Sequence, residues 1–360
     1  MRRLRVHAEN CNYTVCVGRG AWRALRDEAA HSSIFLLTER GLWRRWGKAL
    51  LRESGLRTAQ LIFVPEGEAT KSLKRFEDVA AQLSERRADR HSLLVAFGGG
   101  VIGDLGGFVA STYMRGIDYI QVPTTVVAQA DSAIGGKTAV NIRSVKNLVG
   151  TFYPPRKVLS EPRVLSTLPP RIFRSGLYEV VKHAILCGGG FFRELEARLD
   201  ELQPCNAESL EGVLARAAAV KVDVVNRDEH EAGLRRILNL GHTLGHALEE
   251  ATAYRRFLHG EAVGWGLLGV TRLAELLGVL NPTEGKRIAE LVRRVGPLPP
   301  IRELPARKIL RLLPRDKKAI GGKIHWVLPE RIGKIRITPD VPVKAVAAAL
   351  RNLQRDSPNA

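Results

Sequence analysis

Short apolar runs alternate with helical patterns along the first half of the chain. The mostly apolar runs are 34–38, 59–64, 92–97 and 119–122, each of strand length. Apolar residues recur at helical spacing over 42–53 and 72–87, and a third helix is expected after residue 100 and through Tyr113. Strands that alternate with helices predict a parallel sheet in an α/β domain.

Long helical patterns dominate the second half. They cover 175–186, 191–202, 209–226, 238–251 and 261–277, followed by a strand signal at 323–328 and a closing helix over 343–353. Proline pairs at 154–155 and 169–170 bracket the change in pattern. We therefore expect an α/β domain over residues 1–168 and a mainly α-helical domain over residues 169–360.

Composition narrows the class of protein. A chain of 360 residues suits two domains, and 45% hydrophobic residues exclude a disordered chain. Its apolar runs fall short of the roughly 18 residues of a membrane span. Four cysteines without CxxC or zinc-ribbon spacing suit neither a disulfide scaffold nor a cysteine metal site. These features favour a soluble, cytoplasmic protein.

The net charge of +19 admits two interpretations. One is a nucleic-acid binder, and the other is an enzyme with anionic ligands and an arginine-rich surface. Aromatic residues make up only 6% of the chain, and the basic residues are scattered rather than concentrated in one segment. Both observations disfavour a nucleic-acid binder, which needs aromatic platforms or a basic recognition element.

A glycine-rich loop follows the third predicted strand. Residues 98–103 read Gly-Gly-Gly-Val-Ile-Gly, which fits G-x-G-x-x-G between a strand and a helix and indicates a pyrophosphate site. The acidic residue expected at the end of the next strand is missing, because Asp118 precedes that strand. Glu39 and Glu68 follow earlier strands and could bind the ribose. On position alone, a solvated loop acid is the favoured interpretation of each, and the alternative for the loop itself is a tight turn without a ligand.

Histidines cluster in the second half. His242 and His246 are four residues apart, which places them on one helix face, and His259 follows thirteen residues later. No Glu follows His242, so the HExxH motif is absent. Two histidines with a carboxylate such as Glu179 are typical of a catalytic zinc site. Spacing alone pairs His242 with His246 as ligands, and it also fits helix-surface histidines.

Several anion-binding groups are scattered between these motifs. Residues 131–138 resemble a P-loop fragment but lack its first glycine, which excludes a nucleotide triphosphatase. Further cations and donors are Lys146, Asn147, Lys221, Arg235 and the run Asp316-Lys317-Lys318. Each alone is typical of a surface charge, so their significance depends on whether they converge.

Together these motifs resemble the 3-dehydroquinate synthase family of sugar-phosphate cyclases. The matching blocks are 98–116, 121–125, 131–141, 146–155, 166–185, 233–249, 258–263 and 315–328, in order between about residues 35 and 335. The resemblance implies an NAD- and zinc-dependent phosphate lyase with an NAD-binding domain over 1–168 and a metal- and substrate-binding domain over 169–360. It also implies a homodimer that acts on a small sugar phosphate, without a membrane or nucleic-acid partner.

The resemblance also assigns roles to individual residues. It implies Glu179, His242 and His259 as ligands of zinc, with cobalt as the alternative metal, and His246 as a phosphate and proton-relay group. The implied NAD site comprises Glu39, Glu68, Lys71, Gly99, Gly100, Val101, Asp104, Thr124 and Thr125, with Lys137 and Lys146. The implied substrate residues are Asp131, Lys137, Lys146, Asn147, Lys182, Lys221, Arg235 and Asn239, with Arg115 from a neighbouring subunit and Lys317 or Lys318 closing over the substrate.

One departure from the family pattern lies at the adenosine end of the implied NAD site. The family often has Asp-x-Asn where this chain reads Glu39-Arg40-Gly41. Glu can replace Asp at the ribose hydroxyls, whereas the missing amide removes one adenosine contact. The metal positions and the glycine-rich core show no departure.

The implied reaction converts 3-deoxy-D-arabino-heptulosonate 7-phosphate into 3-dehydroquinate and phosphate. It combines transient oxidation by NAD, β-elimination, reduction, ring opening and an aldol condensation. Two alternatives stay open: a sister cyclase that makes 2-deoxy-scyllo-inosose or 2-epi-5-epi-valiolone, and a metal-dependent polyol dehydrogenase of the related two-domain fold.

Overall fold

The computed structural model describes residues 1–28, 30–56, 59–143, 145–313 and 324–358, which divide into two compact units. The first unit comprises Met1–Leu168 and Gln203–His230, and the second comprises Pro169–Leu202 and Glu231–Ala360. Helix α6 (Ala207–Arg227) packs against β1 and the short helices η4 (Ala128–Ser132) and η5 (Pro162–Thr167). The prediction of a single boundary after residue 168 is therefore corrected for residues 203–230.

A mixed sheet forms the centre of the first unit. Among the described residues it has seven strands in the order β1 (Arg2–His7), β2 (Asn12–Val17), β9 (Lys157–Ser160), β6 (Asp118–Pro123), β5 (Leu93–Gly98), β3 (Ile34–Glu39) and β4 (Gln60–Val64). Only β1 pairs antiparallel. The four predicted strands are confirmed as β3 to β6. The prediction omitted β1 because it lies at a sheet edge, where only Val6 is buried and arginines face outward.

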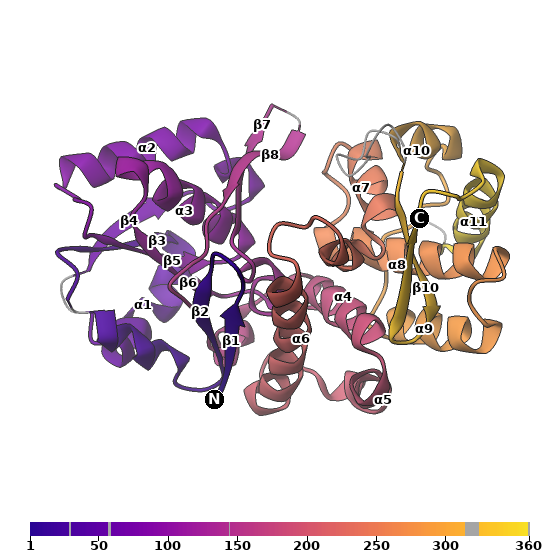
Figure 1. Ribbon diagram of the computed structural model, residues 1–360, viewed down its shortest axis with the longest axis horizontal. Helices are drawn as coiled ribbons and strands as arrows, with labels where there is room; N and C mark the ends of the chain where they lie inside the picture. Colours follow the sequence, from indigo (N-terminus) through magenta and orange to yellow (C-terminus); the bar gives the residue numbers. More distant parts are fainter. Residues whose placement is uncertain (29, 57–58, 144, 314–323, 359–360) are drawn as a thin grey trace. The chain divides into compact units, whose positions relative to one another are not determined.

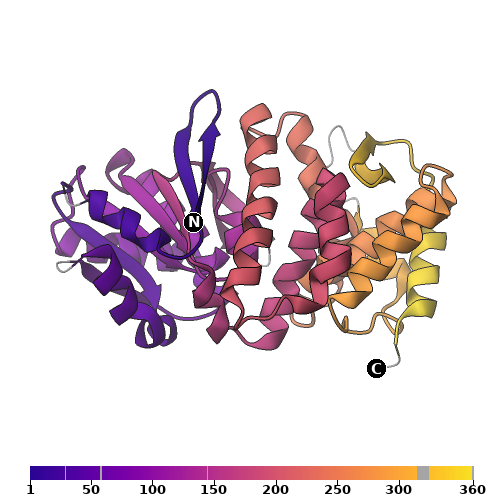
Figure 2. The same ribbon diagram turned by 90° about the horizontal axis from the view of Figure 1, so that it is seen from below.

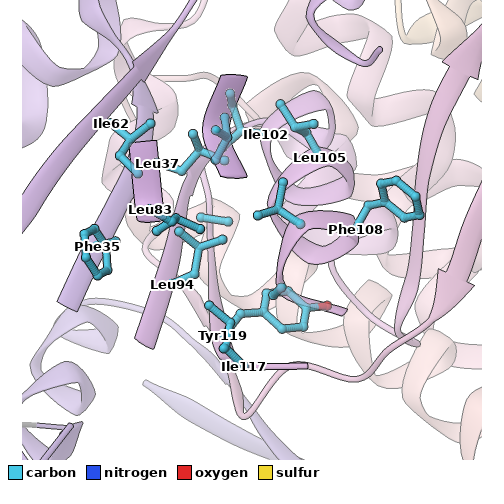
Figure 3. Packing of buried hydrophobic residues seen from close by; sticks show 14 of the residues in the cluster. Phe35, Leu37, Ile62, Leu83, Leu94, Ile102, Leu105, Phe108, Ile117 and Tyr119 are labelled. Atoms are coloured by element: carbon cyan, nitrogen blue, oxygen red, sulfur yellow. The ribbon is translucent and has the colours of Figure 1, made fainter. Parts of the chain in front are cut away.

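Helices cover both faces of this sheet (Figure 1). Helix α1 (Arg40–Ser54) lies with η1 (Ala21–Glu28) on one face, and α2 (Leu73–Glu85) and α3 (Gly100–Thr112) lie on the other. On the α2 and α3 face, Phe35 and Leu37 of β3 pack with Ile102 and Leu105 of α3 (Figure 3). Side chains of both faces are buried, which explains why the strands read as continuous apolar runs rather than alternating ones.

A hairpin that was not predicted packs against α3. It consists of β7 (Lys137–Ile142) and β8 (Val145–Phe152), and its outer face carries exposed apolar side chains, among them Leu148 and Phe152. The register shifts between Val140 and Ile142. Because β8 buries few of its residues, it lacks the apolar periodicity that would have predicted a strand.

The second unit is mainly helical, as predicted. Its elements are α4 (Pro170–Cys187), α5 (Gly189–Arg198), η6 (Leu199–Glu201), η7 (Leu234–Asn239), α7 (His242–Ala251), α8 (His259–Leu276), α9 (Pro282–Arg294), α10 (Ala306–Leu312), β10 (Trp326–Arg331), β11 (Lys334–Thr338) and α11 (Val343–Asp356). Helix α8 is buried along most of its length and packs against α4, α7, α9 and α11 (Figure 2). A helix buried on all sides forms the core of such a bundle.

Two details of this unit differ from the prediction. Helix α7 begins at His242 rather than at residue 238, because Gly241 takes a left-handed conformation with φ 80° and separates it from η7. Helices α9 and α10 and strand β11 were not predicted. Within the described ranges, the helices are too short or too polar to cross a membrane.

Candidate active site

Four parallel strands of the first unit end at one edge of the sheet. Strand β4, which follows β3 in the chain, pairs on one side of β3, and the next strand, β5, pairs on its other side. The strand order therefore reverses between β3 and β5, which makes the crevice between their ends a topological switch point. Glu39 ends β3, and Gly98 ends β5 two residues beyond the paired Leu37 and Ala96. Ligands of open α/β sheets bind in the crevice at such a point. The predicted glycine loop and the predicted ribose carboxylate therefore lie side by side.

The glycine loop leads directly into α3. Gly99 precedes the helix and no side chain caps it, so the N–H groups of the first turn, including those of Gly100 and Val101, face the loop. A Cβ on Gly99 would lie 3.0 Å from Thr125 Cγ2, and the N–H of Thr124 donates to the Gly98 carbonyl over 3.0 Å. Close backbone approach at a helix N-terminus suits a pyrophosphate.

A further carboxylate, Glu66, accompanies Glu39 at this edge. Burial, with the nearby Glu66 carboxylate, raises the pKa of Glu39 from 4.5 to about 7, although the N–H of Gly67 donates to Glu39 and opposes the rise. The Glu66 carboxylate occupies the space that a Cβ on Gly41 would need. Glu66 was not predicted. In this chain it fills the position left open by the glycine that departs from the family's Asp-x-Asn pattern.

Lys71 joins several of the predicted NAD-site residues. Its Nζ donates to Asp104 over 2.6 Å and lies 3.9 Å from Glu68, and it also donates to Asn147 Oδ1. Burial lowers the pKa of Lys71, but Asp104 and Glu68 outweigh it and raise the pKa above its ordinary value. Lys71 is therefore a buried cation that connects the predicted NAD residues with the predicted substrate residue Asn147.

The other substrate residues predicted in the first unit occupy separate elements. Asp131 of η4 and Lys221 of α6 form a buried ion pair. Lys137 begins β7, and Lys146 lies in β8. Arg115 lies in the exposed turn η3 (Tyr113–Arg115), where its φ of 71° is left-handed. The Asp131–Lys221 pair lies where α6 packs against η4 within the first unit.

In the second unit, three helices bring their ligand atoms together. Glu179 of α4 lies 1% exposed, with Oε1 3.6 Å from His242 Nε2 and 3.3 Å from His259 Nε2. His242 begins α7 and His259 begins α8, and the three ligand atoms lie within 4.8 Å of one another. One carboxylate and two imidazoles are the donor set of an open catalytic zinc site.

Hydrogen bonds on the far side of each ring orient the two histidines. His242 Nδ1 faces the Leu240 carbonyl at 3.2 Å, and His259 Nδ1 faces Glu249 Oε2 at 3.3 Å. Burial lowers the pKa of His259, but Glu249 and Glu179 outweigh it and raise the pKa to about 10. The Nε2 atoms of both rings thus point at Glu179, and a divalent ion bound there would take the place of the His259 proton.

The spacing-based pairing of His242 with His246 does not match this arrangement. His246 groups instead with Glu249 and His259, and its ring centroid lies 5.5 Å from that of His242. Lys182 Nζ lies 2.6 Å from Glu179 Oε2 on the same helix. One face of helix α7 thus directs His242 toward Glu179 and places His246 beside the cluster of Glu179, His242 and His259.

The remaining predicted residues of the second unit lie in η7. Arg235 is fully buried, and Asn239 Nδ2 donates to Glu231 Oε1 over 2.9 Å. Lys317 and Lys318 lie outside the described residues. Sequence reasoning missed Glu66, Asn141, Glu231 and Glu249. For Glu249 a signal existed, since it follows His246 by three residues and therefore shares its helix face.

The family models of 3-dehydroquinate synthase match the chain in two parts. The N-terminal model matches residues 61–175, and the C-terminal model matches residues 176–319. A curated 3-dehydroquinate synthase from Koribacter versatilis is 42% identical over 364 residues, covering 98% of each chain.

Two solved structures share the fold over nearly the whole chain. A 2-epi-5-epi-valiolone synthase from Streptomyces hygroscopicus with NAD⁺ and Zn²⁺ bound superimposes with a TM-score of 0.86 at 29% identity, covering 98% of this chain and 100% of that one. A 2-deoxy-scyllo-inosose synthase in complex with carbaglucose-6-phosphate, NAD⁺ and Co²⁺ gives 0.85 at 26% identity, covering 98% and 99%. Together with the family models, these similarities show that the chain belongs to the 3-dehydroquinate synthase family.

Proposed function

We propose that this chain converts 3-deoxy-D-arabino-heptulosonate 7-phosphate into 3-dehydroquinate and phosphate, with NAD and a divalent zinc or cobalt ion as cofactors. The observation that carries the proposal is the convergence of Glu179, His242 and His259 in a chain of this family. The NAD⁺ and metal in two related cyclase structures support the cofactor assignment.

The cofactor-binding residues divide between the two units. Glu39, Glu68, Lys71, Asp104 and the Gly99–Val101 turn would hold NAD, with the carboxylates on ribose hydroxyls, where they would repel a 2′-phosphate. Glu179, His242 and His259 would hold the metal. When bound, NAD supplies a reversible hydride acceptor and the metal a Lewis acid for the substrate hydroxyls.

The chain's own residues then bind the anionic substrate and manage its protons. In the first unit, Lys137, Lys146 and Asn147 would bind phosphate oxygens, and the Asp131–Lys221 pair would orient the sugar ring. In the second unit, Asn239 and His246 would bind phosphate oxygens, and Lys182 and Arg235 would orient the ring through charge-assisted hydrogen bonds. Once the C5 hydroxyl is oxidised to a ketone, the C6 proton is acidic. That proton passes to a phosphate oxygen while the carbon–oxygen bond to phosphate breaks, and His246 relays protons to the leaving group.

The hydride taken from C5 would be returned to C5, so the overall reaction would consume no NAD. Ring opening then exposes a ketone and an enolate that close the carbocycle by an intramolecular aldol step. One site serves several steps, which makes positioning the main contribution of the protein. We extend the proposal to a cytoplasmic homodimer in which Arg115 contacts the substrate phosphate bound to the neighbouring subunit.

Phosphate release by the purified chain tests this proposal. With substrate, NAD⁺ and Zn²⁺ we expect phosphate release without net NADH, whereas a polyol dehydrogenase would accumulate NADH. Correctly folded protein that releases no phosphate would contradict the proposal. A panel with glucose 6-phosphate and sedoheptulose 7-phosphate tests the sister cyclases, whose solved structures resemble this chain.

A variant of one metal-site residue sharpens the test. His259→Ala should lower bound zinc by at least about 100-fold and abolish turnover, because it removes one of three donors. NAD affinity should stay within about twofold, since the predicted NAD residues lie in the other unit. His91→Ala, an exposed histidine in the first unit, is the matched control and should keep full activity.

A further inference from the structure

Asn141 occupies an irregular position in the hairpin of β7 and β8. The register shifts between the pairs Val140–Val149 and Ile142–Val145, so Asn141 of β7 lies opposite a bulge formed by residues 146–148 of β8. Its N–H donates instead to the Lys71 carbonyl over 2.8 Å, next to an isolated parallel bridge with Ser72. Bulges re-aim a side chain and are over-represented next to active sites.

The Asn141 side chain bonds in two directions. Its Nδ2 donates to Glu68 Oε1 over 2.8 Å, and its Oδ1 accepts the backbone N–H of Asn147 over 2.8 Å. Asn147 has a left-handed φ of 52°, a conformation that Asn adopts more readily than most non-glycine residues. One amide of Asn141 therefore links a carboxylate of the proposed NAD site with the left-handed bulge residue Asn147, a proposed substrate residue.

Lys71 closes this arrangement into a ring. Its carbonyl accepts from the Asn141 backbone, while its side chain donates to Asn147 Oδ1 and to Asp104. The segment 68–72 is thus linked to Asn141 and Asn147 through both main-chain and side-chain contacts. Lys71 and Asn141 both contact Glu68 and Asn147, but Asn141 hydrogen-bonds the Asn147 main chain and the Glu68 carboxylate with one side-chain amide. Nothing in the sequence pattern singled out Asn141.

We propose that Asn141 is a positioning residue through which NAD binding orders residues 145–148 of β8, which we call the hairpin tip, before the substrate binds. The inference rests on the proposed function, because Glu68 must hold the ribose. A carboxylate has two oxygens, so Glu68 can keep Oε1 on Asn141 while Oε2 accepts from a ribose hydroxyl. A Glu68 side chain immobilised by NAD then immobilises Asn141 and the Asn147 turn, and the substrate loses less entropy when it binds.

Amide hydrogen exchange of the full chain, with and without saturating NAD⁺, tests the inference directly. In the wild-type chain NAD⁺ should slow exchange over residues 145–148 by about tenfold. In Asn141→Ala the same saturating NAD⁺ should slow it by less than about twofold. The KM for substrate should rise about tenfold relative to wild type, with kcat changed less, because the tip is no longer ordered before the substrate arrives.

A second substitution separates the two hydrogen bonds of Asn141. Asn141→Asp keeps an oxygen for the Asn147 N–H but places a second carboxylate against Glu68. Basal exchange over 145–148 should match wild type, while the NAD⁺-dependent slowing is lost and NAD⁺ binds about fivefold more weakly. Asn12→Ala, at the start of β2, is the matched control and should behave like wild type.

Each outcome separates this inference from the proposed function. If NAD⁺ binds wild type and slows exchange equally in Asn141→Ala, the inference is overturned and the proposed function stands. If both variants lose NAD⁺ affinity but keep the full slowing at saturation, Asn141 acts on Glu68 alone and the inference is also overturned. If the wild-type chain binds no NAD⁺, the proposed function is contradicted, and the inference, which rests on it, is overturned as well.

Discussion

The dinucleotide edge of the first unit and the metal cluster of the second are built in opposite ways. At the edge, loops follow consecutive strands, and much of the binding surface is main chain at the start of α3. In the cluster, single side chains from α4, α7 and α8 meet, contributed by residues 179, 242 and 259. The first arrangement leaves a contiguous motif in the sequence, whereas the second leaves only scattered residues that packing brings together.

The two regions also manage charge differently. At the edge, burial and the Glu66 carboxylate raise the pKa of Glu39, and the Gly67 N–H partly offsets this rise. In the cluster, Glu179 faces two imidazoles and Lys182, and Glu249 lies behind His259. Lys182 and Glu249 thus contact the proposed ligands Glu179 and His259. We therefore expect metal binding to depend on more residues than the three proposed ligands.

Among residues outside the three proposed ligands, the largest expected effect comes from Glu249, which lies behind His259. Glu249→Ala should weaken Zn²⁺ affinity by about 10- to 100-fold, because it removes the acceptor that orients His259. Glu249→Gln, which keeps an acceptor, should weaken it less. Equilibrium dialysis with Co²⁺ and the Co²⁺ absorption spectrum measure this, and unchanged affinity in both variants would show that Glu249 does not orient His259. A metal content of two ions would instead make Glu249 a ligand of a second ion.

A smaller effect, on the free energy of unfolding, is expected from a substitution of Gly107, where α3 packs against the sheet and the hairpin. A Cβ on Gly107 would lie 2.5 Å from Thr138 Cγ2 and 3.2 Å from the Tyr119 hydroxyl. Gly107→Ala should therefore destabilise the chain by about 1–3 kcal/mol, since overpacking outweighs the gain in helix propensity. Gly212→Ala in α6 is the control: no atom lies within 4 Å of its Cβ position, and we expect about 0.5–1 kcal/mol of stabilisation.

Thermal and urea unfolding of the two glycine variants measure that difference. If Gly107→Ala stabilises the chain as much as Gly212→Ala, the packing around Gly107 is looser than the structure describes. NAD⁺ affinity of Gly107→Ala provides a second readout, because the same helix presents its N-terminus to the proposed pyrophosphate site.

The smallest expected effect is a pH dependence at the edge. Because the folded pKa of Glu39 is raised to about 7, the folded chain holds a proton that the unfolded chain releases near pH 4.5. Its contribution to stability is complete below about pH 4.5 and is lost as the pH rises through 7. Glu39→Gln should flatten this part of the stability profile between pH 5 and 8.

NAD⁺ affinity should follow the same titration in the opposite sense. A ribose hydroxyl donates to the carboxylate, so wild-type affinity should increase from pH 6 to pH 8, and Glu39→Gln should bind more weakly with little pH dependence. Isothermal titration at three pH values measures this. A wild-type affinity that is constant with pH would contradict the role of Glu39 at the ribose.

The sequence by itself determined the central strands of the first unit and the glycine loop of the candidate site. Buried strands on both faces of a sheet must be apolar throughout, so β3 to β6 were readable as continuous runs and their C-terminal loops as one edge. The glycine loop was readable because its geometry is local. Edge strand β1 and hairpin strand β8 were not, since most of their residues are exposed: β1 has only the short alternation of Leu4 and Val6, and β8 buries none of its residues.

The tertiary structure decided which side chains meet. It grouped α6 with the first unit, brought Glu179 to His242 and His259, and placed Glu66 against Gly41, Asn141 between Glu68 and Asn147, and Glu249 behind His259. Each of these contacts joins elements whose relative position follows from packing over the whole unit. Sequence periodicity reports the face of one element, whereas a site requires the faces of several elements at once, and only the packed core supplies that.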